Sequence, residues 1–264
     1  MNTQEFITLN YHEAFTRRAV PVLEKGSSVA VCGMEGSGIT YLCRYIAQTW
    51  KREGDRKVLS FTAFGESDQI KLAQYLSSLV LGDEMPADWH LHSLSSLLNQ
   101  MAKKIRENKV GLIFIDRADA APKGFIDSIL TVSSICRDAD WNLGVLLGMR
   151  RSNIRLELFE DEDVSSTAVA LRCQIQPLDA GTILAVLRAM SSQFEEMGSM
   201  VENNDATAVN GLAMLTKISG GNFRRLGQFA SYMDETMQKL SVVPALVDKA
   251  WKDAFAIESL KVAA

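Results

Sequence analysis

Residues 33–40 read GMEGSGIT and carry the glycine spacing of a loop that binds nucleotide phosphates. Such loops have the pattern G-x-x-x-x-G-K-S/T, in which successive backbone N–H groups point into one concavity and hold the phosphates. Thr40 stands at the hydroxyl position that meets Mg²⁺, but Ile39 stands where the pattern has lysine. The alternative is a tight turn unrelated to nucleotide. The predicted nucleotide-binding residues of this loop are Gly33, Gly36, Ser37, Gly38, Ile39 and Thr40.

A second candidate lies at the end of an apolar segment, LIFID, at residues 112–116. An aspartate at the end of a buried strand orients the Mg²⁺ shell in nucleotide-hydrolysing sites, so Thr40 and Asp116 are the predicted magnesium residues. The next residue, Arg117, stands where hydrolysing sites usually carry glutamate. Arginine stays protonated in proteins and cannot act as a general base. The alternative is that Asp116 and Arg117 only end a strand.

The third candidate is SGGNFRRL, residues 219–226. Its glycines are suited to end one helix, and Asn222 is suited to cap the next. Arg224 and Arg225 follow. They are either solvated residues at a helix junction or include an arginine that reaches the nucleotide.

Short apolar segments alternate with segments of helical periodicity over the first two thirds of the chain. This alternation predicts an α/β fold, a parallel sheet with helices on both faces. We expect strands at 28–32, 57–64, 110–116, 142–148 and 169–175. We expect helices at 11–25, 39–52, 65–83, 93–108 and 124–138.

The strands stop at Pro177, and the remainder reads as helices. We therefore expect two domains, an α/β core at 1–177 with a lead-in helix and an all-α subdomain at 178–264. The helices of the second domain are expected at 179–194, 205–220, 222–240 and 243–260.

The composition excludes several classes of protein. Of the 264 residues, 47 % are hydrophobic and 23 % charged, as in ordinary globular proteins. The four cysteines form no C-x-x-C pair, which disfavours zinc and favours free thiols in a cytoplasmic protein. No apolar run is long enough to span a membrane. GMEGSG is not the G-x-G-x-x-G of NAD or flavin proteins, so neither cofactor is expected.

The order of GMEGSGIT, LIFID, LLGMR, VALRCQIQPLD and SGGNFRRL resembles the AAA+ ATPases, over roughly residues 10 to 255. Within them the chain is most similar to the clade of transposition regulators of the MuB, TniB and TnsC type, ExeA-like ATPases and origin-recognition proteins. The resemblance implies a RecA-like core followed by a helical lid. It also implies ATP or ADP with Mg²⁺ as the ligand.

Residue by residue, the resemblance implies a degenerate catalytic site. Retained residues are Thr40, Asp116 and the lid arginine, Arg224. Altered positions are Ile39 for the lysine, Arg117 for the glutamate, Met149 for a polar sensor and Ala168 for the arginine finger. Loss of the water-polarising acid removes a group that organises hydrolysis, so we expect weak or no ATP hydrolysis and name no catalytic residue beyond the retained Asp116.

The resemblance also implies partners. Relatives of this clade assemble as rings or filaments and often bind DNA through basic residues of the core. Here the predicted DNA contacts are Arg150, Arg151 and Arg155 in MRRSNIR. The net charge of −4 gives no overall attraction to double-stranded DNA, so only a local basic patch is expected to bind it.

Three functions follow from these residues. The leading one is an assembly or adaptor protein, a degenerate AAA+ ATPase that regulates DNA transposition or targeting. The second is a divergent but active DNA-associated ATPase, alone or in a mixed oligomer. The third is a signalling switch held by nucleotide without turnover.

Overall fold

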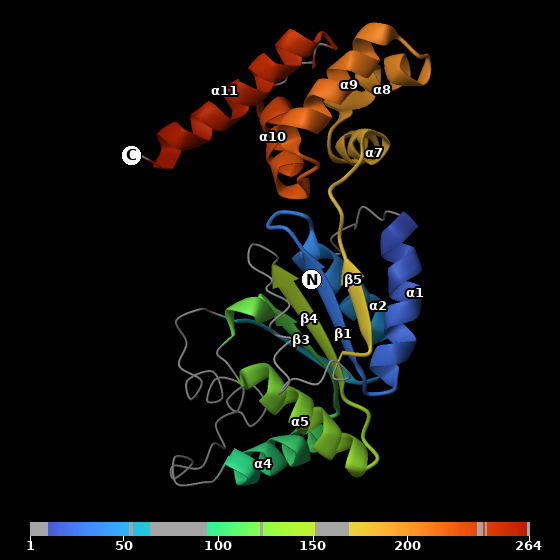
Figure 1. Ribbon diagram of the computed structural model, residues 1–264, viewed down its shortest axis with the longest axis vertical. Coiled ribbons are helices and arrows are strands. Elements are labelled where there is room, and N and C mark those ends of the chain that lie inside the picture. Colours follow the sequence, from blue (N-terminus) through green and yellow to red (C-terminus); the bar gives the residue numbers. More distant parts are fainter. Residues whose placement is uncertain are drawn as a thin grey trace. The chain divides into compact units, whose positions relative to one another are not determined.

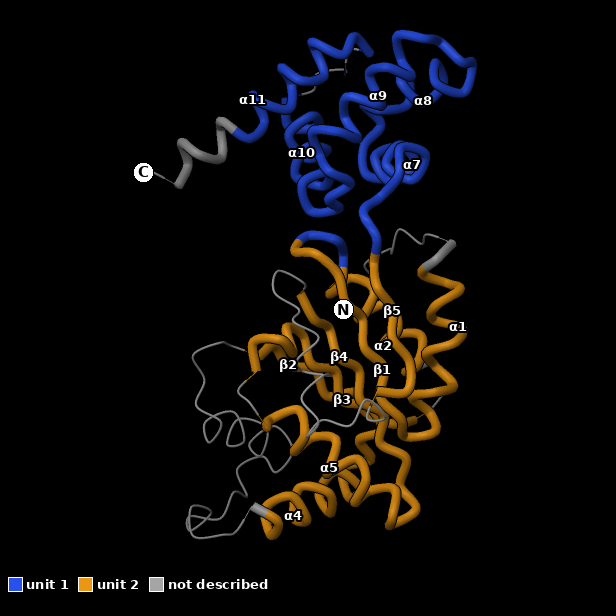
Figure 2. Tube along the Cα trace, viewed as in Figure 1, with its two compact units in different colours: residues 1–9, 36–38, 176–264 blue, residues 10–35, 39–175 orange. Residues whose placement is uncertain are grey.

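The computed structural model describes residues 10–52, 55–63, 94–121, 124–150, 169–236, 240 and 242–262. The helix expected at 65–83 lies outside the described residues. The chain folds into two compact units (Figure 2). An α/β unit comprises residues 10–35 and 39–175, and a helical unit comprises residues 176–264 with the loop residues 36–38.

A five-stranded sheet forms the α/β unit, as the alternation of apolar segments predicted (Figure 1). Its strands are β1 (Ser28–Gly33), β2 (Lys57–Thr62), β3 (Val110–Asp116), β4 (Gly144–Arg150) and β5 (Leu171–Gln174). The order across the sheet is β2-β3-β4-β1-β5, and every neighbouring pair is parallel. Parallel pairing brings the carboxyl ends of β1, β3 and β4 to one edge, where ligands bind in open α/β sheets.

Helices cover both faces of this sheet, which confirms the predicted fold class. Successive strand residues point to opposite faces, so Val29 and Val31 pack with one helix pair and Ala30 with the other. The helices of the first face are α1 (Asn10–Glu24) and α2 (Ile39–Arg52). Those of the second face are α4 (Leu94–Glu107) and α5 (Phe125–Asp138).

The helical unit has one helix that the sequence did not predict. Its elements are α7 (Ala180–Met190), η4 (Ser192–Phe194), α8 (Glu195–Glu202), α9 (Ala206–Ser219), α10 (Phe223–Thr236) and α11 (Pro244–Val262). The unpredicted helix, α8, has only 8 residues, too few to show a clear apolar period, but Glu195 and Glu196 suit its N-terminus. Buried Phe194, Phe229 and Trp251 lie in sequential ring contact, with centroids 5.9 and 5.1 Å apart.

The SGGN segment joins α9 to α10 as its residue types predict. Gly220 caps α9 in the left-handed region with φ of 59°, and Gly221 follows with φ of 65°. Asn222 caps α10, because its Oδ1 accepts a hydrogen bond from the backbone N–H of Arg225 at 3.1 Å. Two consecutive left-handed residues reverse the chain, and glycine adopts that conformation without strain.

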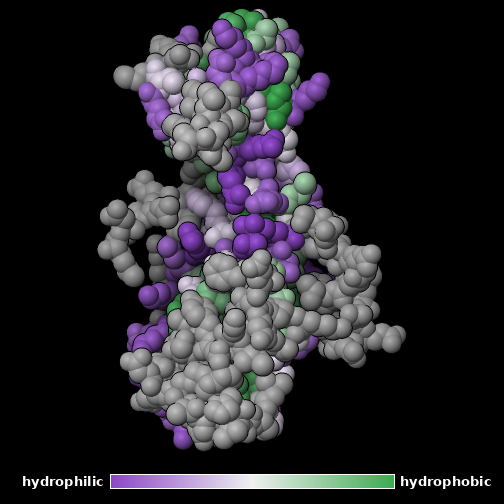
Figure 3. Space-filling view, turned by 90° about the vertical axis from the view of Figure 1, so that its left-hand side faces the viewer, coloured by the Kyte–Doolittle hydropathy of each residue, from purple (hydrophilic) through white to green (hydrophobic). Residues whose placement is uncertain are grey.

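The surface of the helical unit mixes hydrophilic and hydrophobic residues (Figure 3). Large exposed hydrophobic side chains there are Val209, Val243 and Leu246. Scattered exposed apolar residues are ordinary for a globular protein. No helix within the described ranges combines the length and apolarity needed to cross a membrane.

Candidate functional site

Thr40 and Asp116 meet at the carboxyl edge of the sheet. Thr40 lies in the first turn of α2, and Asp116 is the last residue of β3. The Thr40 hydroxyl lies 3.0 Å from each oxygen of the Asp116 carboxylate and donates a hydrogen bond to it. The backbone N–H of Arg117 also donates to Asp116, at 3.1 Å. A hydroxyl beside a carboxylate offers the hard oxygen ligands that Mg²⁺ prefers, and Mg²⁺ sites commonly add waters and substrate phosphates to one or two carboxylates.

Ile39 turns its side chain into the protein. It is 6 % exposed and packs in the apolar cluster between α2 and the sheet. A Cβ built on Gly148 of β4 would lie 3.3 Å from Ile39 Cγ2, from Cys43 Sγ and from Asp116 Oδ1. Gly148 therefore leaves the space that Ile39 and Asp116 fill together.

The β4 residue beside Asp116 is Gly148, which has no side chain to act as a polar sensor. Met149, at the expected sensor position, is buried and packs in the cluster on the opposite face of the sheet with α4 and α5. Neither residue presents a polar side chain beside Asp116.

Arg117 has an unusual backbone for its residue type. Its φ and ψ are 56° and 42°, the left-handed region, which costs a residue with a Cβ about 1–2 kcal/mol. Its Nε is buried without a hydrogen-bond partner among the described residues. A desolvated cationic donor thus follows directly after Asp116, where a hydrolysing site needs an acid.

The tip of the glycine loop contains two glycines with positive φ. Gly36 and Gly38 have φ of 79° and 96°, conformations that favour glycine. Ser37 between them has a buried hydroxyl without a partner in the described part of the chain. An unsatisfied buried hydroxyl is costly unless a ligand or water completes its hydrogen bonds. The loop therefore fits a phosphate group.

The loop tip also contacts the SGGN segment within the helical unit. The backbone N–H of Arg224 donates to the Gly36 carbonyl at 2.9 Å. A Cβ on Gly36 would clash with the Asn222 amide group. The Arg224 side chain is exposed. Glycine suits position 36 because of its φ, and an added Cβ would also displace the Asn222 amide that caps α10.

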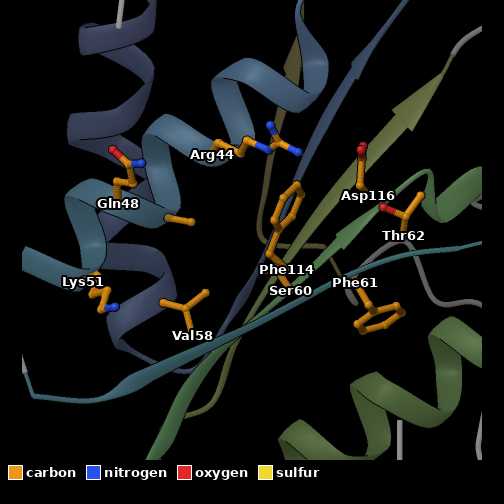
Figure 4. A pocket seen from close by; sticks show the side chains of 10 residues that line it. Arg44, Gln48, Lys51, Val58, Ser60, Phe61, Thr62, Phe114 and Asp116 are labelled. Carbon is orange, nitrogen blue, oxygen red and sulfur yellow. The ribbon is translucent and has the colours of Figure 1, made fainter. Parts of the chain in front are cut away.

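A cavity of about 430 Å³ extends from Asp116 along α2 (Figure 4). Its α2 wall includes Arg44 and Lys51, and its sheet wall includes Thr62 and Phe114. Sequence reasoning missed Arg44, although a signal was present. Arg44 follows Thr40 by four residues, and that spacing places two helical residues on one face.

A family model described as an AAA domain matches residues 23–155, half of the chain, including β1, Ile39, Thr40 and Asp116. The chain belongs to the AAA+ superfamily of P-loop ATPases. The comparison with curated proteins gave no match.

Solved structures share the AAA+ fold with this chain at low sequence identity. The ORC2 protein of Aeropyrum pernix, in ADPNP–ADP complexes, has a TM-score of 0.63 at 16 % identity, covering 96 % of this chain and 70 % of that one. The ORC1 protein of the same organism, in complex with DNA, has a TM-score of 0.59 at 17 % identity, covering 93 % and 66 %. Domain III of the Thermotoga maritima replication initiation protein DnaA has a TM-score of 0.56 at 18 % identity, covering 94 % of each chain. These likenesses establish the fold.

The arginines predicted to contact DNA are only partly described in this AAA+ chain. Arg150 ends β4, and its guanidinium lies 3.1 Å from the Glu35 carboxylate. Its backbone N–H donates to Asp119 at 2.8 Å. Arg151, Arg155 and the predicted finger position Ala168 lie outside the described residues. The charge of Arg150 is thus partly neutralised by Glu35.

The cysteines of this AAA+ chain are free thiols, and the described residues hold no cluster of three or more His, Cys, Asp or Glu arranged for a metal ion. Burial raises the pKa of Cys136 to about 11 and, with the nearby sulfur of Cys32, that of Cys173 to about 11. Burial and then the Asp116 carboxylate raise the pKa of Cys43 well above its usual value.

We expect these buried thiols to make the protein less stable above pH 9. Unfolded thiols lose their protons near pH 9, whereas the folded Cys136 keeps its proton until about pH 11. Stability from this group is therefore complete below pH 9 and falls as the pH rises toward 11. Urea unfolding of the wild type and of Cys136→Ala from pH 7.5 to 10.5 tests this. The wild type should lose stability more steeply with pH, and equal slopes would contradict the assignment.

Proposed function

We propose that this chain is a degenerate AAA+ module that binds nucleotide with Mg²⁺, hydrolyses it weakly or not at all, and acts as an assembly or adaptor factor. The observation that carries the proposal is the hydrogen-bonded pair of Thr40 and Asp116 beside buried Ile39. The two residues that would bind magnesium are present, whereas the position of the phosphate-binding lysine holds the apolar Ile39.

Nucleotide binding is supported by the fit of the described residues. Gly36 and Gly38 have positive φ values, and the buried Ser37 hydroxyl lacks a partner in the described part of the chain. Thr40 and Asp116 would hold Mg²⁺, which would neutralise phosphate charge when bound. The ORC2 structure of similar fold was solved with ADPNP and ADP. Arg224 stays a proposed nucleotide contact.

Weak hydrolysis is supported by the residues that surround Asp116. Arg117 cannot accept a proton from water, and its guanidinium adds positive charge instead of a general base. Gly148 offers no polar side chain on the neighbouring strand. ATP hydrolysis depends on activation of the attacking water and on stabilisation of the charge on the phosphates. Isoleucine at position 39 and arginine at position 117 should therefore together lower turnover strongly.

An assembly role on DNA is the functional context we propose, as in transposition regulators. It is supported by the resemblance in motif order and by the ORC1 structure of the same fold in complex with DNA. The proposed partners are further protein subunits and double-stranded DNA. The proposed DNA contacts are Arg150, Arg151 and Arg155, and Arg150 would have to exchange its ion pair with Glu35 for a DNA phosphate.

Calorimetric titration of Mg²⁺–ATP into the protein tests nucleotide binding. We expect measurable binding by the wild type and at least a tenfold loss in Asp116→Ala, because that change removes a magnesium ligand and the partner of Thr40. Asp119→Ala is the control and should bind like the wild type, since Asp119 is exposed and its carboxylate contacts only the Arg150 backbone N–H at the end of β4 among the described residues. An absence of heat in the wild type at millimolar ATP would refute nucleotide binding.

Phosphate release separates the adaptor from the divergent ATPase. We expect weak Mg²⁺-dependent release or none, with or without double-stranded DNA. Strong release that disappears in Asp116→Ala would establish an active enzyme and overturn the adaptor proposal.

A further inference from the structure

We propose that Arg44 of α2 supplies the terminal phosphate of a bound nucleoside triphosphate with the cation that Ile39 cannot supply. The inference rests on the proposed nucleotide binding and assigns a residue to it. The position that holds lysine in intact loops is filled by a buried apolar side chain, so the positive charge on the phosphate must come from another residue.

Helix geometry places Arg44 on the correct face of α2. Thr40 is fixed toward β3 by its hydrogen bond with Asp116. Arg44 is four residues later, so it lies one turn of about 5.4 Å from Thr40 on the same face. Helical side chains lean toward the N-terminus of their helix, so Arg44 leans toward Thr40 and the start of α2.

The cavity brings this guanidinium and the magnesium-site carboxylate to one space. Arg44 and Asp116 both line the cavity of about 430 Å³. In Figure 4 the Arg44 side chain extends from α2 toward the Asp116 carboxylate, while the Lys51 side chain does not. Arg44 is thus the cation of this cavity that points toward the carboxyl edge of the sheet.

The charge of Arg44 is available to a ligand. Within the described ranges its guanidinium forms no ion pair or hydrogen bond, although Asp116 lies in the same cavity. The Asp116 oxygens are occupied by Thr40 and by the Arg117 N–H. A planar guanidinium with several donors pairs well with two phosphate oxygens at once. The ligand class that matches is a nucleoside triphosphate, whose Mg²⁺ ion Thr40 and Asp116 would hold.

Paired titrations with Mg²⁺–ATP and Mg²⁺–ADP test the assignment, using the full chain. The variants are Arg44→Ala, Arg44→Lys and the control Lys51→Ala, which removes a like charge from the same helix and the same cavity. We expect Arg44→Ala to weaken ATP binding roughly tenfold or more and ADP binding less than about threefold, since only ATP has the third phosphate. Arg44→Lys should keep part of the ATP affinity, and Lys51→Ala should resemble the wild type.

Each other outcome has a definite meaning. Equal ATP affinities of wild type and Arg44→Ala would overturn this inference and leave the proposed function standing. An equal loss of ATP and ADP, or the same loss in Lys51→Ala, would overturn the assignment to the terminal phosphate. A wild type that binds neither nucleotide would refute the proposed function itself. Thermal unfolding without nucleotide shows that each variant is folded.

Discussion

Replacing Phe229 with alanine is expected to lower the free energy of unfolding of the helical unit by about 3–5 kcal/mol. Phe229 of α10 is 0 % exposed, and its ring lies 5.9 Å from that of Phe194 and 5.1 Å from that of Trp251. It therefore joins η4 and α11 through one side chain. Removing it leaves a cavity between two aromatic rings that are fixed by different elements, so the cavity cannot collapse easily.

Urea unfolding followed by circular dichroism measures this effect, with Leu246→Ala as the control. Leu246 lies on α11 in the same unit but is 48 % exposed, so its truncation should change stability by less than about 1 kcal/mol. If the two units unfold separately, Phe229→Ala should move only one transition. A change in Phe229→Ala as small as that in Leu246→Ala would contradict the central packing role of Phe229.

Gly221→Ala is expected to destabilise the helical unit by roughly 2–4 kcal/mol, combining left-handed strain with overpacking. Gly221 has φ of 65°, and its carbonyl accepts a hydrogen bond from the Leu178 N–H at 3.1 Å. An added Cβ would lie 2.5 Å from both the N and the O of Leu178. Those atoms belong to the backbone, so they cannot move aside as a flexible side chain can.

A substitution at the adjacent Gly220 distinguishes left-handed backbone strain from overpacking. Gly220 is also left-handed, with φ of 59°, but nothing in the described part of the chain lies within 4 Å of an added Cβ. Gly220→Ala should therefore cost only the backbone strain, about 1 kcal/mol. Thermal and urea unfolding of the two variants give the comparison directly. Equal losses would show that the close approach of Leu178 is relieved by a small backbone shift.

The architecture was predictable because its strands are buried on both faces. Segments such as VGLIFID are continuously apolar and end at polar residues, so the sequence indicated that they are strands and in which order they occur. Boundaries were less clear: β4 runs from Gly144 to Arg150, two residues later than expected, because its end is set by pairing with β1. The short helix α8 has too little periodicity to be read from sequence.

The candidate site was predictable in its residues more than in its geometry. The patterns pointed to Thr40 and Asp116, which the structure brings into hydrogen-bond contact. They could not show that Ile39 packs against the space left by Gly148, since that depends on how α2 lies on the sheet. Arg44 belongs to no motif, and only the cavity between α2 and β2 indicates a role for it.

The strand order has a consequence for the newly made chain. β1 is complete at Gly33, but both of its neighbours, β4 and β5, begin only at Gly144 and Leu171. At about 5–20 residues per second, the ribosome needs on the order of ten seconds to make the first of them. During that time the largely apolar β1 has no neighbouring strand to pair with. We therefore expect chaperones to bind β1 during synthesis.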